Sequence, residues 1–237
     1  PAQADEICRV YRVGRPEKFR VIPLGLDFDE LEPAAGAARP AWFGVPRAPV
    51  VALVGRLTGV KNVDLFLEAV AALSADGRAR DAGFIIVGDG ELRGELERKS
   101  VSLGLADRVA FAGNRDDMAA VYSTVDIMAV SSHNEGTPLS IIEGMSRGIP
   151  FVSTAVGGVP DLAGALMRKC DTYDVHERGL LAAAGDARGF ADALARMIED
   201  IELRRGLGAA GRDFTRAHYG IDRLADDVKG LYIGLLK

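Results

Sequence analysis

The chain has 237 residues, of which 48% are hydrophobic and 27% charged, and its formal net charge is -5. This length and apolar content allow one large domain or two small ones with a full buried core. Lysines and arginines are scattered rather than clustered, which argues against a nucleic-acid partner. No apolar run approaches the roughly 20 residues that a bilayer-spanning helix needs, so we predict no transmembrane segment.

The two cysteines bear on the cellular compartment of the protein, and the first residues bear on its domain organisation. Cys8 and Cys170 lie far apart and lack metal-ligand spacing, so we predict neither a disulfide nor a zinc site. This usage favours a reducing compartment, and we expect a cytoplasmic protein, with peripheral attachment to the inner face of a membrane left open. Pro1 enters a helical pattern that continues to Tyr11. We therefore expect a fragment whose preceding domain is absent.

Short apolar runs alternate with amphipathic segments along most of the chain. After a short predicted strand at 19–23 and a linker over 24–49, strands are predicted at 50–54, 84–87, 109–111, 127–130, 150–153 and 179–181. Helices are predicted between them, for example at 62–75 and 91–104, and then at 187–200, 202–216 and 221–236. The alternation predicts an α/β fold with a parallel sheet and helices on both faces.

Functional residues of such a sheet are expected directly after its strands, because ligands bind at the carboxyl ends of parallel strands. Arg56 follows the first strand, and Lys61 lies five residues later, where the next helix begins. A guanidinium, an ammonium and helix amides together suit a diphosphate. From these residues alone, two ordinary surface charges on a solvated loop remain the alternative.

The second strand ends in Gly88-Asp89-Gly90, which either lets a ligand approach the backbone or makes a tight turn. The dinucleotide-binding fingerprint would place the next glycine one position before Gly94, and no suitable acidic residue follows. We therefore discount a nicotinamide- or flavin-dependent dehydrogenase.

A second anion site is predicted at the helix that follows the fourth strand of the regular α/β region. Thr137 is a plausible N-cap, and Pro138 suits the first helical position. The amides of Leu139 and Ser140 would then point out of the helix start and bind an anion.

Two glutamates flank this predicted anion site. Glu135 lies in the loop and Glu143 in the helix, eight residues on, so both can face one cleft. Carboxylates repel phosphate but accept hydrogen bonds from hydroxyls, which a sugar nucleotide carries on its ribose and on its sugar. A capped helix with solvated glutamates remains the alternative reading of these residues.

Four motifs taken together resemble a known family. In chain order they are Gly55-Arg56 with Lys61, Gly88-Asp89-Gly90, the Glu135 and Glu143 pair, and Gly157-Gly158-Val159-Pro160. This order resembles the retaining GT-B glycosyltransferases, which include sucrose synthase and bacterial mannosyl- and glucosyltransferases. The resemblance implies a Rossmann-like C-terminal, donor-binding domain at 50–220. It also implies the tail of the N-terminal domain with a linker at 1–49 and a crossing helix at 221–237.

The resemblance also implies roles for individual residues. Arg56 and Lys61 would hold the donor diphosphate and stabilise the leaving group. Glu143 would bind the ribose hydroxyls, and Glu135 would contact the donor sugar. Glu135, Arg56 and Lys61 are therefore the predicted catalytic residues.

Backbone groups complete the implied donor site. Those of Gly136, Thr137, Leu139 and Ser140 would line the diphosphate. Gly88 would contribute at the second strand, and Gly113 belongs to the loop against which the base would pack. Many relatives have an aromatic residue and a glycine where this chain has Thr137 and Pro138, and the proline removes one amide donor.

The implied reaction transfers a glycosyl group from a nucleoside diphosphate sugar to an acceptor hydroxyl with retention of configuration. We expect a UDP-sugar, with GDP- or ADP-sugars as alternatives, and a carbohydrate, lipid or other hydroxyl acceptor held by the absent N-terminal domain. The cations and the helix dipole would stabilise the leaving group, so we expect no cofactor and no metal. Asp27-Phe28-Asp29 spells a metal-binding motif but falls in the linker, and we interpret it as chance. His133 is interpreted as structural.

Two other classes of function compete with this reading. A GT-B sugar-nucleotide epimerase would share the architecture, although the glutamate spacing together with Arg56 and Lys61 argues against it. A non-catalytic nucleotide-sugar-binding module also stays open. A flavodoxin-like receiver domain would need an acidic pocket at the strand ends, where this chain has cations.

Overall fold

An eight-stranded sheet organises the computed structural model, which describes residues 7–32 and 49–236. The strand order is β3-β2-β1-β4-β5-β8-β7-β6. The strands are β1 (Val50–Val54), β2 (Gly83–Val87), β3 (Val109–Gly113), β4 (Ile127–Val130), β5 (Phe151–Thr154), β6 (Leu166–Lys169), β7 (Tyr173–His176) and β8 (Gly179–Ala182). All six strands predicted from Val50 onward are present within about two residues of their predicted bounds.

The sheet is parallel from β3 to β8, and β7 and β6 extend it as an antiparallel hairpin. The predicted fold class is therefore confirmed, whereas the prediction of a wholly parallel sheet is wrong at this edge. The sequence pattern missed the hairpin because all four residues of β6 are exposed. An edge strand with two cations, Arg168 and Lys169, shows no apolar run.

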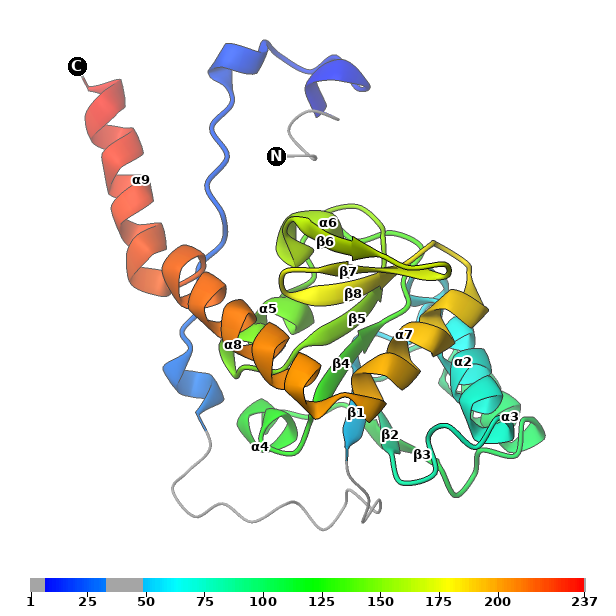
Figure 1. The fold of residues 1–237 in the computed structure, drawn as a ribbon. Coiled ribbons are helices and arrows are strands. Elements are labelled where there is room, and N and C mark those ends of the chain that lie inside the picture. Colours follow the sequence, from blue (N-terminus) through cyan, green and yellow to red (C-terminus); the bar gives the residue numbers. More distant parts are fainter. Residues whose placement is uncertain (1–6, 33–48, 237) are drawn as a thin grey trace.

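Helices cover both faces of the sheet, as predicted (Figure 1). Alternate residues of a strand point to opposite faces, so Val51 and Leu53 pack in one core while Val50 and Ala52 pack in the other. The first core is closed by α2 (Val63–Ala75), α3 (Arg93–Ser102) and α7 (Ala187–Glu199). The second is closed by α4 (Met118–Tyr122), α5 (Leu139–Ser146) and α6 (Val159–Ala163), and α8 (Ile201–His218) packs against α5 and α7.

The start of the described chain and the last helix lie away from this body. The helix α9 (Ile221–Leu235) has no buried residue, and in Figure 1 it extends beyond the sheet, as does the segment from residue 7 to about residue 20. The two are joined where the amide of Leu26 donates to Tyr219 O at 2.8 Å and the amide of Ile221 donates to Leu26 O at 3.0 Å. These bonds connect the segment around Leu26 to the junction between α8 and α9.

The strand predicted at 19–23 does not form. Short 3-10 turns occur at η1 (Pro16–Lys18) and η2 (Asp29–Leu31), and the bridge between Leu26 and Gly220 is the pairing found there within the described residues. An extended segment needs a neighbouring strand to satisfy its backbone, and the described residues supply none at 19–23. The start of the helical pattern before Ile7 and most of the predicted linker lie outside the described residues.

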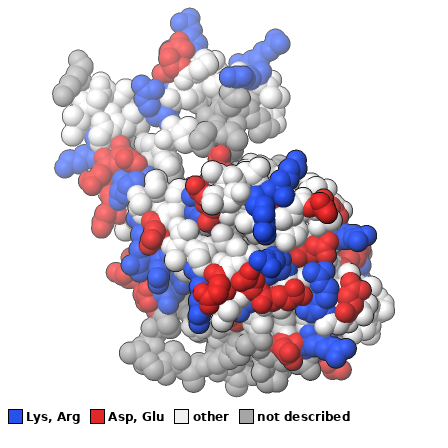
Figure 2. Space-filling model, in the orientation of Figure 1, with Lys and Arg blue, Asp and Glu red and all other residues white. Residues whose placement is uncertain are grey.

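Charged side chains of both signs share the visible surface. Figure 2 shows lysines and arginines intermixed with aspartates and glutamates on the face in view. On α7, for example, Asp192 pairs with Arg78 at 2.7 Å and Arg196 pairs with Asp200 at 2.6 Å. None of the helices in the two described ranges combines the length and apolar character needed to cross a membrane.

Candidate functional site

Three loops interlock at the carboxyl edge of the sheet. The amide of Gly55, after β1, donates to Val87 O of β2 at 2.9 Å, and the amide of Gly88 donates to Gly113 O of β3 at 2.8 Å. Gly88 has φ +132°, and a Cβ there would overlap the carbonyl oxygen of Gly55. Glycine is therefore required at this position for the loops to close together.

The two predicted cations follow β1 but differ in their contacts. Arg56 is exposed, and within the described parts of the chain it has no ion pair or side-chain hydrogen bond. Lys61 ends a 3-10 turn, η4 (Gly59–Lys61), and its Nζ lies 2.6 Å from Oε1 of Glu135. The structure thus brings Lys61 and Glu135 together, although their predicted targets were the diphosphate and the sugar.

Glu135 is held by a second donor that the sequence analysis missed. The hydroxyl of Ser132 donates to the same Oε1 at 2.6 Å. The Glu135 side chain is only 8% exposed, and a charged and a neutral donor together satisfy its Oε1 atom. No motif in the sequence marks this contact, although Ser132 precedes Glu135 by only three residues.

Glu143 is held in a comparable way by one protein donor. It lies in α5, and its Oε2 accepts a hydrogen bond from the hydroxyl of Tyr122 in α4 at 2.5 Å. Tyr122 is buried, and burial, together with the nearby Glu143 charge, raises its pKa above the usual value. Tyr122 was also missed, because its helix shows no motif.

The start of α5 differs from the prediction in its cap. Pro138 is the N-cap residue, with ψ +107°, and no side chain caps the helix, so Thr137 lies outside the cap. The extended backbone of the proline moves the first helical position to Leu139. The amides of Leu139 and Ser140 have no intrahelical acceptor at these positions, so both are available as donors, and their binding of an anion stays a prediction.

The motif Gly157-Gly158 packs directly on the loop that carries Glu135. The amide of Gly158 donates to Glu135 O at 3.1 Å. A Cβ on Gly157 would overlap Glu135 O, and one on Gly158 would overlap Gly136 O. The fourth motif therefore shapes the Glu135 loop through backbone contact.

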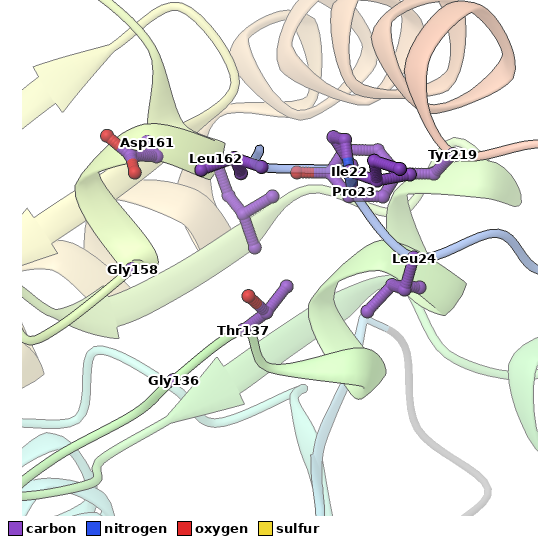
Figure 3. Close-up of a pocket in the computed structure, with 10 residues that line it drawn as sticks. Ile22, Pro23, Leu24, Gly136, Thr137, Gly158, Asp161, Leu162 and Tyr219 are labelled. Atoms are coloured by element: carbon purple, nitrogen blue, oxygen red, sulfur yellow. The ribbon is translucent and has the colours of Figure 1, made fainter. Parts of the chain in front are cut away.

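A cavity of about 150 Å³ lies behind this loop (Figure 3). Gly136, Thr137 and Gly158 form one side, and Tyr219 and the segment 21–24 form another. In Figure 3 the side chain of Leu162 points toward Thr137. Thr137 thus lines this cavity instead of capping α5.

The loop after β3, predicted to meet the base, is bordered by ion pairs. Arg93 pairs with Asp89 at 2.8 Å and with Glu97 at 2.9 Å, and its Nη1 lies 3.1 Å from where a Cβ on Gly113 would stand. The amide of Gly90 and then the Arg93 guanidinium hold the pKa of Asp89 below its usual value. The loop is therefore bordered by two ion pairs that share Arg93.

Two further predicted features have local roles. Asp27 accepts a hydrogen bond from the amide of Asp29 at 3.0 Å, so this motif forms a turn before η2. The amide of His133 donates to Val60 O at 2.8 Å, and its side chain is exposed. Within residues 7–32 and 49–236, no group of three or more potential metal-ligating side chains is found.

These features define a class of protein: a doubly wound α/β domain whose strand ends present helix amides, cations and two anchored carboxylates. The family model for glycosyl transferases group 1 matches residues 48–200. This match covers more than half of the chain, and the chain therefore belongs to that family.

Similar proteins extend the comparison. D-inositol 3-phosphate glycosyltransferase of Saccharomonospora viridis is 31% identical over 240 residues, covering 97% of this chain and 53% of the relative. The UDP-Gal:alpha-D-GlcNAc-diphosphoundecaprenol alpha-1,3-galactosyltransferase of Escherichia coli is 29% identical and covers 98% of this chain and 58% of the relative. The chain thus spans about half the length of these relatives.

A solved structure supports the fold. Sucrose-phosphate synthase from Thermosynechococcus elongatus matches with a TM-score of 0.81 and 27% identity, over 99% of this chain and 56% of that chain. The fold predicted from the motif order, that of a GT-B C-terminal domain, is confirmed by this match.

Proposed function

We propose that the chain is the donor-binding half of a glycosyltransferase that moves a sugar from a nucleoside diphosphate to an acceptor hydroxyl with retention of configuration. The observation that carries the proposal is the pair of anchored carboxylates. Glu135 and Glu143 each have one oxygen held by protein donors, which leaves the other for a substrate hydroxyl. Family membership supplies the reaction class.

The diphosphate would bind between the β1 loop and the start of α5. Arg56 is exposed and can form paired hydrogen bonds with phosphate oxygens. The amides of Leu139 and Ser140 supply further donors, and the helix dipole favours negative charge there. Lys61 would turn from Glu135 toward a phosphate oxygen, because its ammonium is carried on a long flexible stem.

The two glutamates would accept hydrogen bonds from the hydroxyl groups of the donor. Glu143 would accept from the ribose and Glu135 from the transferred sugar, as the motif order implies. Backbone at Gly88, Gly113, Gly136 and Thr137 would border the nucleotide, and the tight loop packing supports this arrangement.

Catalysis would come from stabilising the departing diphosphate. Negative charge grows on it as the glycosyl bond breaks, and preorganised cations and amides lower the energy of that transition state. The proposed mechanism requires no cofactor and no metal. In the proposed division, this chain contributes the tail of the N-terminal domain with a linker at 1–49, the donor-binding domain at 50–220 and a crossing helix at 221–237. The whole enzyme would add an acceptor-binding half. The cytoplasmic location also remains a prediction.

The donor proposed is a UDP-sugar. Its support is the name of the Escherichia coli relative, which acts with UDP-Gal. GDP- and ADP-sugars are the alternatives, since the Gly113 loop by itself does not select a base.

Calorimetric titration of the 237-residue chain with UDP, GDP, ADP and their sugar conjugates tests the proposal. We expect UDP and UDP-sugars to bind, and a ligand at 100 times its Kd to stabilise the fold by about 2.7 kcal/mol. Absence of binding by every nucleotide would refute the proposed site.

Turnover distinguishes the rival functions. With water as acceptor, the whole enzyme should release nucleotide and the sugar in its original anomeric form, observed first by NMR. An epimerase would invert a sugar stereocentre, and a binding module would leave the donor intact.

A further inference from the structure

We propose that Ser132 is a positioning residue that keeps the Glu135 carboxylate oriented toward the donor sugar while Lys61 pairs with the diphosphate. This inference rests on the proposed function, because it assigns a second residue to the same site. It adds a contact that no motif in the sequence indicated.

The geometry places two donors on one carboxylate oxygen. Ser132 Oγ and Lys61 Nζ each lie 2.6 Å from Oε1 of Glu135. The Oε2 atom accepts no hydrogen bond from the residues that the structure describes. One oxygen is thus fixed by the protein, and the other is presented to a ligand.

The two donors differ in how firmly they are held. Ser132 is 1% exposed, and its own carbonyl oxygen accepts from Thr154 Oγ1 at 2.6 Å, across the junction of β4 and β5. The Lys61 side chain is 28% exposed and carries a long flexible stem. The serine is therefore held more firmly than the lysine, which can move to a nearby anion.

A bound diphosphate would compete for the lysine. The Lys61 ammonium would then pair with phosphate oxygens, and its contact with Glu135 Oε1 would loosen or break. Only the Ser132 hydroxyl would still hold that oxygen. Removal of this hydroxyl should therefore weaken recognition of the sugar while nucleotide recognition is preserved.

The test compares Ser132→Ala with Ser131→Ala. Ser131 is the matched control, because it is equally buried at 1% exposure and its Oγ donates to the carbonyl of Lys61 at 3.1 Å, not to Glu135. For each variant, calorimetry gives Kd for UDP and for UDP-glucose or UDP-galactose, whichever the parent binds.

We expect Ser132→Ala to lose about tenfold in affinity for the UDP-sugar, as loss of one hydrogen bond to a charged group predicts, with UDP affinity changed less than about twofold. Ser131→Ala should keep the ratio of the two Kd values. An unchanged ratio in Ser132→Ala would overturn the inference. Failure of the parent to bind any nucleotide would instead overturn the proposed function.

A second variant guards against a folding defect. If Ser132→Ala melts far below Ser131→Ala, then Ser132→Cys is measured, because it fills the same space with a weak donor. The same selective loss for the UDP-sugar is expected. Equal loss for UDP and UDP-sugar in Ser132→Cys would show a merely structural role and refute the inference.

Discussion

The ammonium of Lys61 lies 2.6 Å from Oε1 of Glu135, although 74 positions separate the two residues in the chain. Lys61 follows β1 and Glu135 follows β4, and these two strands are neighbours in the sheet. The cation assigned to the diphosphate therefore neutralises the carboxylate assigned to the sugar. In the proposed site, binding of the diphosphate would therefore be coupled to recognition of the sugar through this pair.

Loss of either cation is expected to weaken nucleotide binding. Arg56→Ala and Lys61→Met should each raise the Kd for UDP about tenfold or more, because each removes a hydrogen bond to a charged group. Arg98→Ala, an exposed arginine on α3, is the control and should bind like the parent. Parent-like UDP affinity in both site variants, measured by calorimetry, would contradict the diphosphate assignment.

The Tyr122 contact gives a test of ribose recognition. Tyr122→Phe removes the hydroxyl that holds Glu143 Oε2, so Glu143 should discriminate less between UDP and 2′-deoxy-UDP. We expect the ratio of their Kd values to fall several-fold toward one in the variant. Tyr232→Phe, with Tyr232 65% exposed on α9, serves as control. A ratio equal to that of the parent would argue against Glu143 as the ribose acceptor.

The same tyrosine predicts a dependence of stability on alkaline pH. Burial, and then the Glu143 charge, raise the pKa of Tyr122 above its ordinary value of 10.0. As pH rises above 10.0, the tyrosine ionises in the unfolded chain before it does so in the folded one, so the free energy of unfolding falls.

Denaturant titrations of parent and Tyr122→Phe measure this effect. Between about pH 10 and 11 the parent should lose about 1 kcal/mol more stability than the variant, since one pKa unit corresponds to about 1.36 kcal/mol. The other tyrosines are present in both proteins and cancel. Parallel pH curves would show that Tyr122 ionises normally.

Alanine substitutions at two glycines distinguish the cost of backbone strain from the cost of steric overlap with the Glu135 loop. Gly104 and Gly157 have φ +72° and +53°, but a Cβ meets nothing within 4 Å at Gly104 and overlaps Glu135 O at Gly157. Gly104→Ala should cost about 1–2 kcal/mol of unfolding free energy. Gly157→Ala should cost more and also weaken UDP-sugar binding, because the Glu135 loop must shift. Equal costs in thermal unfolding, with equal binding, would contradict the packing role of Gly157.

Local patterns in the sequence account for much of the fold and for the location of the site. The apolar runs after Val50 place six strands, and the residues after them lie at one edge because parallel strands end together. The β6 and β7 hairpin was not predicted, because an exposed edge strand needs no apolar run. The prediction that Thr137 caps α5 was wrong, because Pro138 has an extended backbone and is itself the N-cap residue.

The sequence by itself determined the fold class, the family resemblance and which loops carry chemistry, since hydrophobic period and glycine spacing act within a few residues. Only the tertiary structure decided that Lys61 and Ser132 share one oxygen of Glu135 and that Tyr122 holds Glu143. Such contacts depend on strand order, helix packing and side-chain rotamers over the whole domain, and local spacing contains none of these.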